Sequence, residues 1–153
     1  MQRIASFTVN HDFIRPGVYI SRMDGDVVTY DLRTRRPNGG DYMSPLTMHS
    51  VEHLFATYVR NSAWGDKVIY FGPMGCRTGF YLLLRDLPVE QVKPLLVDTL
   101  RRCIAHKGSM PGASRQECGN FRGLSLAAGQ EECRRFLAVV EKINSNEFAY
   151  PKE

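Results

Sequence analysis

The stretch His49-Ser50-Val51-Glu52-His53 contains residue types that can bind a metal ion and move protons beside it. On an α-helix, positions i and i+4 lie on one face about one turn apart, so both imidazoles can reach a single ion. Glu52 precedes the second histidine by one residue, where its carboxylate can accept and return protons next to a Lewis acid. This order, H-x-x-E-H, is that of the inverzincins. Two surface histidines around a solvated glutamate are the alternative, but two of only four histidines at ligand spacing favour metal binding.

Two imidazoles do not complete a metal site, so a third ligand is needed. The residues alone leave several candidates open: downstream carboxylates, His11, Cys76, Cys103, Cys118 and Cys133. Cys103 and Cys133 lie in apolar helical stretches, which is typical of core thiols. Cys76 and Cys118 each sit beside glycine in a turn or loop, where a thiolate can approach a ligand and be stabilised by a cation. A buried loop thiol is the alternative for either of them.

A capped helix carries the histidine motif. Ser44 is a typical N-cap residue and Pro45 a typical first helical residue, and the apolar spacing continues to about Ala63. Upstream, residues 17–32 predict a β-hairpin with a tight turn at Asp24-Gly25. The Pro, Asn and Gly content of residues 34–41 predicts a loop between the hairpin and the helix.

Downstream of this helix, two short strands are predicted over residues 67–71 and 79–84, around the Gly-rich turn that contains Cys76. A second helix should run from Pro88 to about His106, with a bend or a later start at Pro94. Residues 109–123 are irregular. A third helix fills roughly 126–143, with Gly129 as a weak point. Strands and helices mix without a βαβ rhythm, which predicts an α+β sandwich of an antiparallel sheet and helices.

The composition indicates one soluble globular domain over residues 1–153. No apolar run approaches the roughly 20 residues that span a bilayer, and the amino terminus lacks the apolar stretch of a secretion signal, so we expect a cytoplasmic protein with no membrane partner. The net charge of +4 is spread in short groups without interleaved aromatics or a known motif. Nucleic-acid binding is therefore not expected, and the charge suits solubility or attraction of anionic small molecules.

Over nearly its whole length the chain resembles the S-ribosylhomocysteine lyases, or LuxS family, which make the precursor of autoinducer-2. The resemblance is specific because separate motifs occur in the same order along the chain. These motifs are Ser6-Phe7-Thr8-Val9-Asn10-His11, Tyr30-Asp31-Leu32-Arg33 with Pro37-Asn38, His49-Ser50-Val51-Glu52-His53-Leu54-Phe55-Ala56, Pro73-Met74-Gly75-Cys76-Arg77-Thr78-Gly79-Phe80-Tyr81, Glu117-Cys118-Gly119-Asn120 and Ile143-Asn144-Ser145-Asn146-Glu147.

The resemblance implies a role for each matching residue. The metal ligands are His49, His53 and Cys118, with water or substrate oxygen in the fourth place, and the proton-transfer residues are Glu52 and Cys76. The family's metal is Fe(II), which zinc or cobalt can replace. The residues that match ribose contacts are Ser6, His11 and Arg33. Without the resemblance, no local sequence pattern indicates a function for Ser6 or Arg33, and His11 is typical of a surface or capping histidine.

The resemblance also implies an assembly and a fold. The family is homodimeric, with active sites at the subunit interface, and its α+β sandwich is related to one half of the inverzincin-type metallopeptidases. One departure concerns the substrate's amino-acid end. Family members commonly have an Asp three residues before the Pro-Met-Gly-Cys run and then, after one residue, a Ser, whereas this chain has Tyr70 and Gly72. The Asp is associated with the homocysteine ammonium.

The implied reaction breaks a thioether without a redox cofactor and yields homocysteine and 4,5-dihydroxy-2,3-pentanedione. The carbonyl must migrate from C1 to C3 of the ribose, after which loss of the C4 proton expels the thiolate from C5. Each step needs a metal to polarise a carbonyl, and an acid and a base on suitable sides of the sugar. Two other classes share the motif: a metallopeptidase, and a non-catalytic zinc-stabilised binding module, whose site four protein ligands would close. Neither of these classes explains why both Cys76 and Cys118 lie in motifs that match the family.

Overall fold

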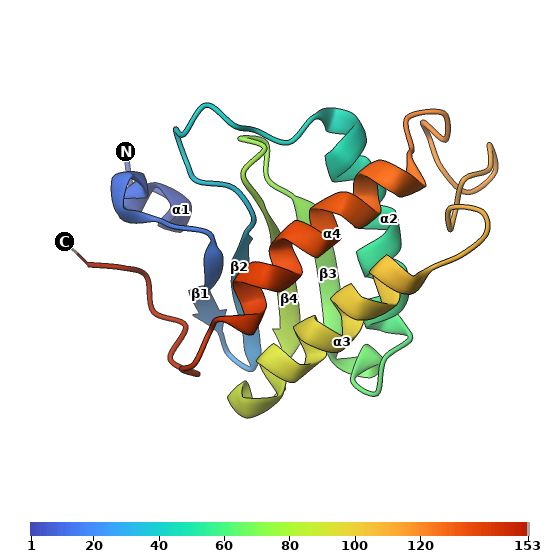
Figure 1. The fold of residues 1–153 in the computed structure, drawn as a ribbon. Helices are drawn as coiled ribbons and strands as arrows, with labels where there is room; N and C mark the ends of the chain where they lie inside the picture. Colours follow the sequence, from blue (N-terminus) through green and yellow to red (C-terminus); the bar gives the residue numbers. More distant parts are fainter. Residues whose placement is uncertain (153) are drawn as a thin grey trace.

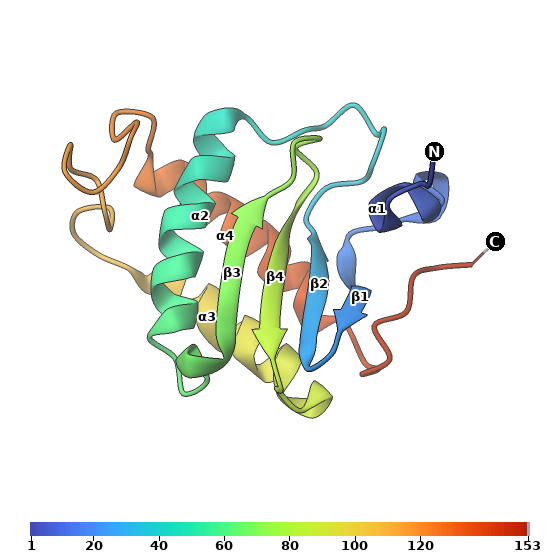
Figure 2. The same ribbon diagram turned by 180° about the vertical axis from the view of Figure 1, so that it is seen from behind.

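The computed structural model describes residues 1–152, and in them four strands form one antiparallel sheet in the order β1-β2-β4-β3. The strands are β1 (Gly17–Asp24), β2 (Val27–Arg33), β3 (Val68–Pro73) and β4 (Gly79–Arg85). The helices α2 (Pro45–Arg60), α3 (Val92–Ala105) and α4 (Leu126–Glu141) pack on one side of the sheet, as Figures 1 and 2 show from opposite sides. The expected α+β architecture, an antiparallel sheet packed with helices, is confirmed.

The register of β2 against β4 brings the Gly-rich turn beside the end of β2. Arg33 pairs with Gly79, the first residue of β4. A Cβ atom at Gly79 would lie 2.6 Å from the backbone oxygen of Leu32, so only glycine fits this close approach. The turn that contains Cys76 is therefore held next to Arg33.

Aromatic stacking fixes α2 on the sheet. The ring of Phe71 on β3 lies between Phe55 on α2, at a centroid distance of 4.4 Å, and Phe80 on β4, at 5.0 Å. Helix α4 approaches α2 closely at Gly129, where a Cβ atom would lie 2.9 Å from Leu54 Cδ1. Gly129, a weak point by helix propensity, is thus the contact that allows the two helices to pack.

The structure corrects several predicted boundaries. Helix α2 ends at Arg60 and α4 at Glu141, two or three residues before the predicted ends, because the last residues of each pattern form turns. Of the two alternatives predicted from Pro94, a bend or a later start, the structure has the later start: α3 begins at Val92, after the 3-10 turn η3 (Val89–Gln91). The short elements α1 (Ala5–Thr8), η1 (His11–Phe13) and η2 (Gly65–Lys67) were not predicted, since one turn of helix has no apolar periodicity.

The two cysteines predicted for the core are buried there, Cys103 on α3 and Cys133 on α4. A hydrogen bond with the Cys133 thiol and burial both raise the pKa of Cys103. A thiol held in its neutral form cannot serve as a metal ligand. In residues 1–152, no helix has the length and apolarity that crossing a membrane requires.

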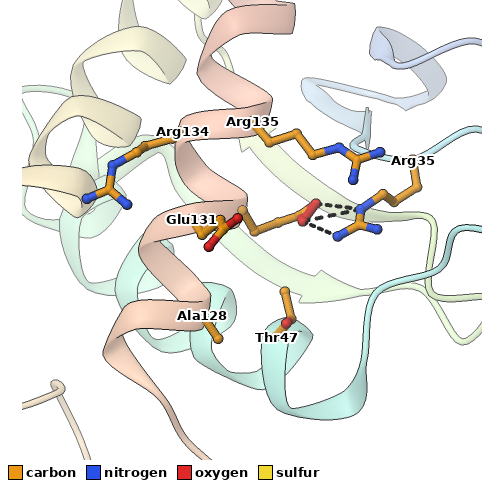
Figure 3. Close-up of a pocket in the computed structure, with 7 residues that line it drawn as sticks. Arg35, Thr47, Ala128, Glu131, Arg134 and Arg135 are labelled. Atoms are coloured by element: carbon orange, nitrogen blue, oxygen red, sulfur yellow. Dashed lines mark hydrogen bonds and ion pairs between the residues drawn. The ribbon is translucent and has the colours of Figure 1, made fainter.

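A buried ion pair ties the loop after β2 to α4. The guanidinium of Arg35 donates to both carboxylate oxygens of Glu132, at 2.6–3.2 Å, and the Glu132 side chain is only 3% exposed. Asp41 bridges Arg35 and Arg135. Figure 3 shows the pair at the wall of a surface groove of about 570 Å³, which Glu131 and Arg134 also line. The loop that leads into α2 is therefore attached to the helix layer.

We expect Glu132→Ala to lower the free energy of unfolding by about 3 kcal/mol, because Arg35 would keep its charge with its buried partner removed. Urea unfolding followed by circular dichroism measures the change. Glu131→Ala alters the exposed neighbour on the same helix and should stay within about 0.5 kcal/mol of the parent protein. Equal stability of the two variants would show that the ion pair does not hold the loop.

Candidate metal centre

Helix α2 presents His49 and His53 on one side. Its N-cap is Ser44, whose hydroxyl accepts a hydrogen bond from the Thr47 amide at 3.1 Å, as predicted. Val51, Leu54 and Phe55 bury the opposite side in the core. The two imidazole rings lie edge to face with their centroids 4.7 Å apart. The i, i+4 spacing of the motif thus places the two imidazole rings side by side, and each is half-buried.

Backbone carbonyls fix the tautomer of both histidines. Nδ1 of His49 lies 2.8 Å from the oxygen of Gly123, and Nδ1 of His53 lies 2.7 Å from the oxygen of Pro111. A carbonyl only accepts, so each Nδ1 carries a hydrogen and donates it. In the neutral rings Nε2 is then the unprotonated atom. This is the arrangement that protein metal sites use to orient histidine ligands.

Cys118 completes the group from the irregular loop between α3 and α4. Its Sγ lies 3.4 Å from His49 Nε2, and the ligand atoms of His49, His53 and Cys118 are all within 4.8 Å of one another. Ligands around a tetrahedral ion stand about 3.6 Å apart, given bonds of about 2.1 Å to nitrogen and 2.3 Å to sulfur. Two unprotonated nitrogens and a thiol at this separation fit a divalent transition metal.

A glycine lets the loop approach the second ligand. Gly112 has φ of +69°, a conformation that other residues rarely adopt, and a Cβ atom there would lie 3.0 Å from His53 Nδ1. The neighbouring carbonyl of Pro111 can therefore reach the ring. The Cys118 thiol is in turn supported by the Asn120 amide, which lies 3.4 Å away and donates to Sγ.

Glu52 lies on α2 between the two ligand histidines, and its side chain is half-buried. One residue of an α-helix corresponds to about 100° of rotation, so Glu52 points beside the His49–His53 pair and not along it. In the described residues, its carboxylate makes no hydrogen bond or ion pair with another side chain. It is thus free to exchange a proton with a molecule bound at the centre.

Cys76 belongs to a second polar group, at the end of β2. Its Sγ lies 3.0 Å from Thr78 Oγ1, to which Arg33 also donates at 2.8 Å. The Arg33 side chain is 3% exposed and binds both oxygens of Asp31, at 2.6 and 3.0 Å. Burial acts to lower the pKa of Arg33, but the hydrogen bonds and charge of Asp31 outweigh it and raise that pKa. A buried ion pair of Arg33 and Asp31 therefore lies beside the Cys76 turn.

A tyrosine from the C-terminal segment closes this second group. The hydroxyl of Tyr150 donates to Asp31 at 2.7 Å. Burial and the negative charge of Asp31 raise the pKa of Tyr150, so it stays a donor. The i, i+2 spacing of Asp31 and Arg33 on a strand could have indicated their common face. The sequence held no signal for the partners Thr78 and Tyr150, nor for the carbonyls of Pro111 and Gly123.

The remaining residues from the matching motifs lie at the N-terminal end. Ser6 is on α1 and lines a hollow of about 310 Å³ on the outer side of the sheet, together with Tyr70 and Tyr81. His11 begins η1, and its Nδ1 donates to the carbonyl of Val9 at 2.9 Å. Within residues 1–152, no hydrogen bond or ion pair joins these residues to the metal ligands or to the Arg33 group.

Tyr70 and Gly72, the two departures from the family pattern, depend on each other. A Cβ atom at Gly72 would lie 2.1 Å from the hydroxyl oxygen of Tyr70 and 2.6 Å from Cζ. The Tyr70 ring thus extends along β3 over Gly72, in the space that a serine side chain would fill. A residue larger than glycine at position 72 would displace the tyrosine.

Comparisons with known proteins identify the family of the chain. The family S-Ribosylhomocysteinase (LuxS) matches residues 4–147. The chain is 42% identical to an S-ribosylhomocysteine lyase of Clostridium acetobutylicum over 99% of this chain and 100% of the relative. Identity is 43% with the lyase of Clostridium beijerinckii, over 99% of each chain, and 39% with that of Phocaeicola vulgatus, over 99% and 98%. This chain therefore belongs to the S-ribosylhomocysteinase (LuxS) family.

Proposed function

We propose that this protein is a metal-dependent lyase that cleaves the thioether of S-ribosylhomocysteine to homocysteine and 4,5-dihydroxy-2,3-pentanedione. The observation that carries the proposal is the His49, His53 and Cys118 group, with Glu52 on the same helix, in a chain of the LuxS family. The relatives named S-ribosylhomocysteine lyase align over almost their whole length, which supports the same substrate for this chain.

His49, His53 and Cys118 are the proposed ligands of one divalent ion per subunit. Three protein ligands leave a coordination position open, which is the usual arrangement of a catalytic centre. We expect Fe(II), with Zn(II) or Co(II) as replacements after purification. The ion supplies Lewis acidity, which polarises sugar carbonyls and stabilises negative charge on their oxygens.

Glu52 and Cys76 are the proposed proton-transfer residues. The sulfur on C5 becomes a leaving group only after the sugar carbonyl has moved from C1 to C3. This isomerisation removes a proton from one carbon and returns a proton to its neighbour, twice, and the elimination then removes the C4 proton as the C5–S bond breaks. A carboxylate and a thiolate on different sides of the sugar suit this sequence. Arg33 donates to Thr78 Oγ1, which lies 3.0 Å from the Cys76 sulfur, so this hydroxyl connects the buried arginine to the thiol.

Ser6, His11 and Arg33 are proposed to contact the ribose. Ser6 borders an open hollow, so its hydroxyl is available to a sugar oxygen. His11 uses Nδ1 for the Val9 carbonyl, which leaves Nε2 to accept from a sugar hydroxyl. Most N–H donors of Arg33 are already bonded to Asp31 and Thr78. We therefore assign Arg33 the smallest direct contact with the sugar and a larger role in holding Thr78 beside Cys76.

We propose a homodimer with active sites at its interface. Large apolar side chains are exposed on α1 and on the outer side of the sheet, namely Phe7 and Tyr70, which supports this assembly. A second subunit on this surface would bury them and enclose the hollow that Ser6 lines.

We further propose a cytoplasmic enzyme formed as a single domain over residues 1–153. All four cysteines are free, and a reducing compartment preserves the Cys76 and Cys118 thiols that the chemistry requires. One continuous core joins the sheet to α2, α3 and α4, which supports a single domain. The H-x-x-E-H helix on an antiparallel sheet supports the suggested relation to inverzincin halves. A peptidase or a structural zinc module is not favoured, since neither explains the family match.

Replacing a ligand should remove the metal. We expect His49→Ala, His53→Ala and Cys118→Ala to lose most bound ion, because each deletes one of three ligands. Metal content per chain, measured after gel filtration under anaerobic conditions, tests this. Cys76→Ala is the matched control for Cys118→Ala and should keep its metal. Full occupancy in Cys118→Ala would refute the ligand assignment.

Replacing a proton-transfer residue should stop catalysis and spare the metal. As Gln, residue 52 keeps its shape and loses its basicity, so Glu52→Gln should bind metal and substrate but release thiol at least 100-fold more slowly. Cys76→Ala should behave likewise and stall at a different carbon. Deuterium incorporation from solvent into unreacted substrate and trapped ketones distinguishes the two. Near-normal thiol release from either metal-loaded variant would contradict its assigned role.

Tyr70 in place of the usual Asp should weaken recognition of the substrate's ammonium group. We expect the KM for S-ribosylhomocysteine and the KM for its analogue with hydrogen in place of the amino group to agree within tenfold. Removing the ammonium group weakens binding by more than about 1.4 kcal/mol only if the protein makes a charged contact with it. Steady-state kinetics on both substrates measures this. A far lower rate with the deaminated analogue would show that another residue holds the ammonium.

A further inference from the structure

The loop that supplies Cys118 needs anchors at its ends. Residues 106–125 contain no helix or strand, and the hydrogen bonds inside the loop are local, such as that from the Cys118 amide to Ser114 at 3.1 Å. Ordering such a segment costs conformational entropy. Its exit is attached to α2 by the Ser125 amide, which donates to Ser50 Oγ at 2.8 Å. In Figure 1 the loop (orange) leaves the end of α3 (yellow) and returns to the start of α4 beside α2.

The imidazole of His106 attaches the other end of the loop to α2. Its Nε2 lies 2.8 Å from the backbone oxygen of Ser109, so Nε2 carries a hydrogen and donates. In a neutral ring Nδ1 then accepts, and the hydroxyl of Tyr58 on α2 donates to it at 2.7 Å. The ring thus bridges α2 to Ser109, two residues before Pro111.

The backbone around His106 is held from α4. The side-chain amide of Gln130 lies 3.2 Å, 3.1 Å and 2.8 Å from the carbonyl oxygens of Cys103, Ile104 and His106, and its nitrogen is the donor. Carbonyls at the end of a helix lack partners within it, so this amide caps α3. His106 is therefore fixed by both neighbouring helices, through its ring and through its carbonyl.

We propose that His106 is a positioning residue for the metal centre. Its bridge between Tyr58 and Ser109 fixes the position of the loop relative to α2 where the loop leaves α3. The Pro111 carbonyl is then within hydrogen-bond distance of His53 Nδ1, and Cys118 lies beside His49. The inference rests on the proposed metal site and adds to it residues that do not bind the ion. Within the described residues, no hydrogen bond joins His106 to His49, His53 or Cys118, so His106 acts through the loop.

The test measures the affinity of the metal-free protein for Co(II) by competition with a chelator, and the thiolate-to-cobalt absorption that reports Cys118. We expect His106→Phe to weaken Co(II) binding by 10- to 100-fold and reduce that absorption, the usual range for losing a residue that orients ligands. Tyr58→Phe removes one end of the bridge and should weaken binding at least threefold. His106→Gln supplies both an acceptor and a donor and should restore affinity to within about threefold of the parent.

Tyr19→Phe is the matched control for Tyr58→Phe, because it too deletes a hydrogen bond made by a tyrosine hydroxyl. The acceptor in this case is the backbone carbonyl of Arg15, at 2.6 Å and away from the loop. The Tyr19→Phe variant should keep the parent affinity. Parent affinity in both His106→Phe and Tyr58→Phe, or equal losses in the Gln and Phe variants at position 106, would overturn the inference. Failure of the parent protein to bind Co(II) would contradict the proposed metal centre itself.

Discussion

The hydrogen bonds from the two histidine rings to loop carbonyls are the interactions on which the metal centre depends. The acceptors, Pro111 and Gly123, lie on either side of Cys118 in the chain. The same bonds that orient the imidazoles therefore place the thiol, and neither half of the site is correctly formed without the other. Metal binding should order helix and loop together, since the ion requires both histidines unprotonated at Nε2 and the sulfur within reach.

The rest of the fold keeps α2 in place for this purpose. Phe71 stacks between Phe55 and Phe80, and Gly129 lets α4 pack directly on α2. These contacts give the histidines a rigid base, whereas the third ligand comes from a segment without regular structure. The Cys76 turn is positioned separately, by the close pairing of Gly79 with β2 and the buried ion pair of Arg33 and Asp31. Two rigid polar groups on one scaffold suit a reaction with proton transfers at several carbons.

Much of this arrangement could be predicted from the sequence because it follows from periodicity and local turn chemistry. The cap at Ser44 and the buried places of Cys103 and Cys133 are of this kind. The hairpin itself was also predicted, but its turn lies at Gly25-Asp26, one residue later than the predicted Asp24-Gly25, because Asp24 still pairs with Val27. What escaped prediction depends on backbone atoms or on contacts distant in sequence. A carbonyl such as that of Pro111 is common to every residue type. The Asp31 carboxylate that pairs with Arg33 also accepts a hydrogen bond from Tyr150, which lies more than a hundred residues away.

In the proposed function, one metal ion, bound by two helix nitrogens and one loop sulfur, supports thioether cleavage. The most direct measurement titrates the metal-free protein with Fe(II) under anaerobic conditions and follows thiol release from S-ribosylhomocysteine in the same samples. The account predicts that the rate rises in proportion to bound metal and reaches its maximum at one ion per chain. Thiol release that is independent of metal, or no release at full occupancy, would contradict it.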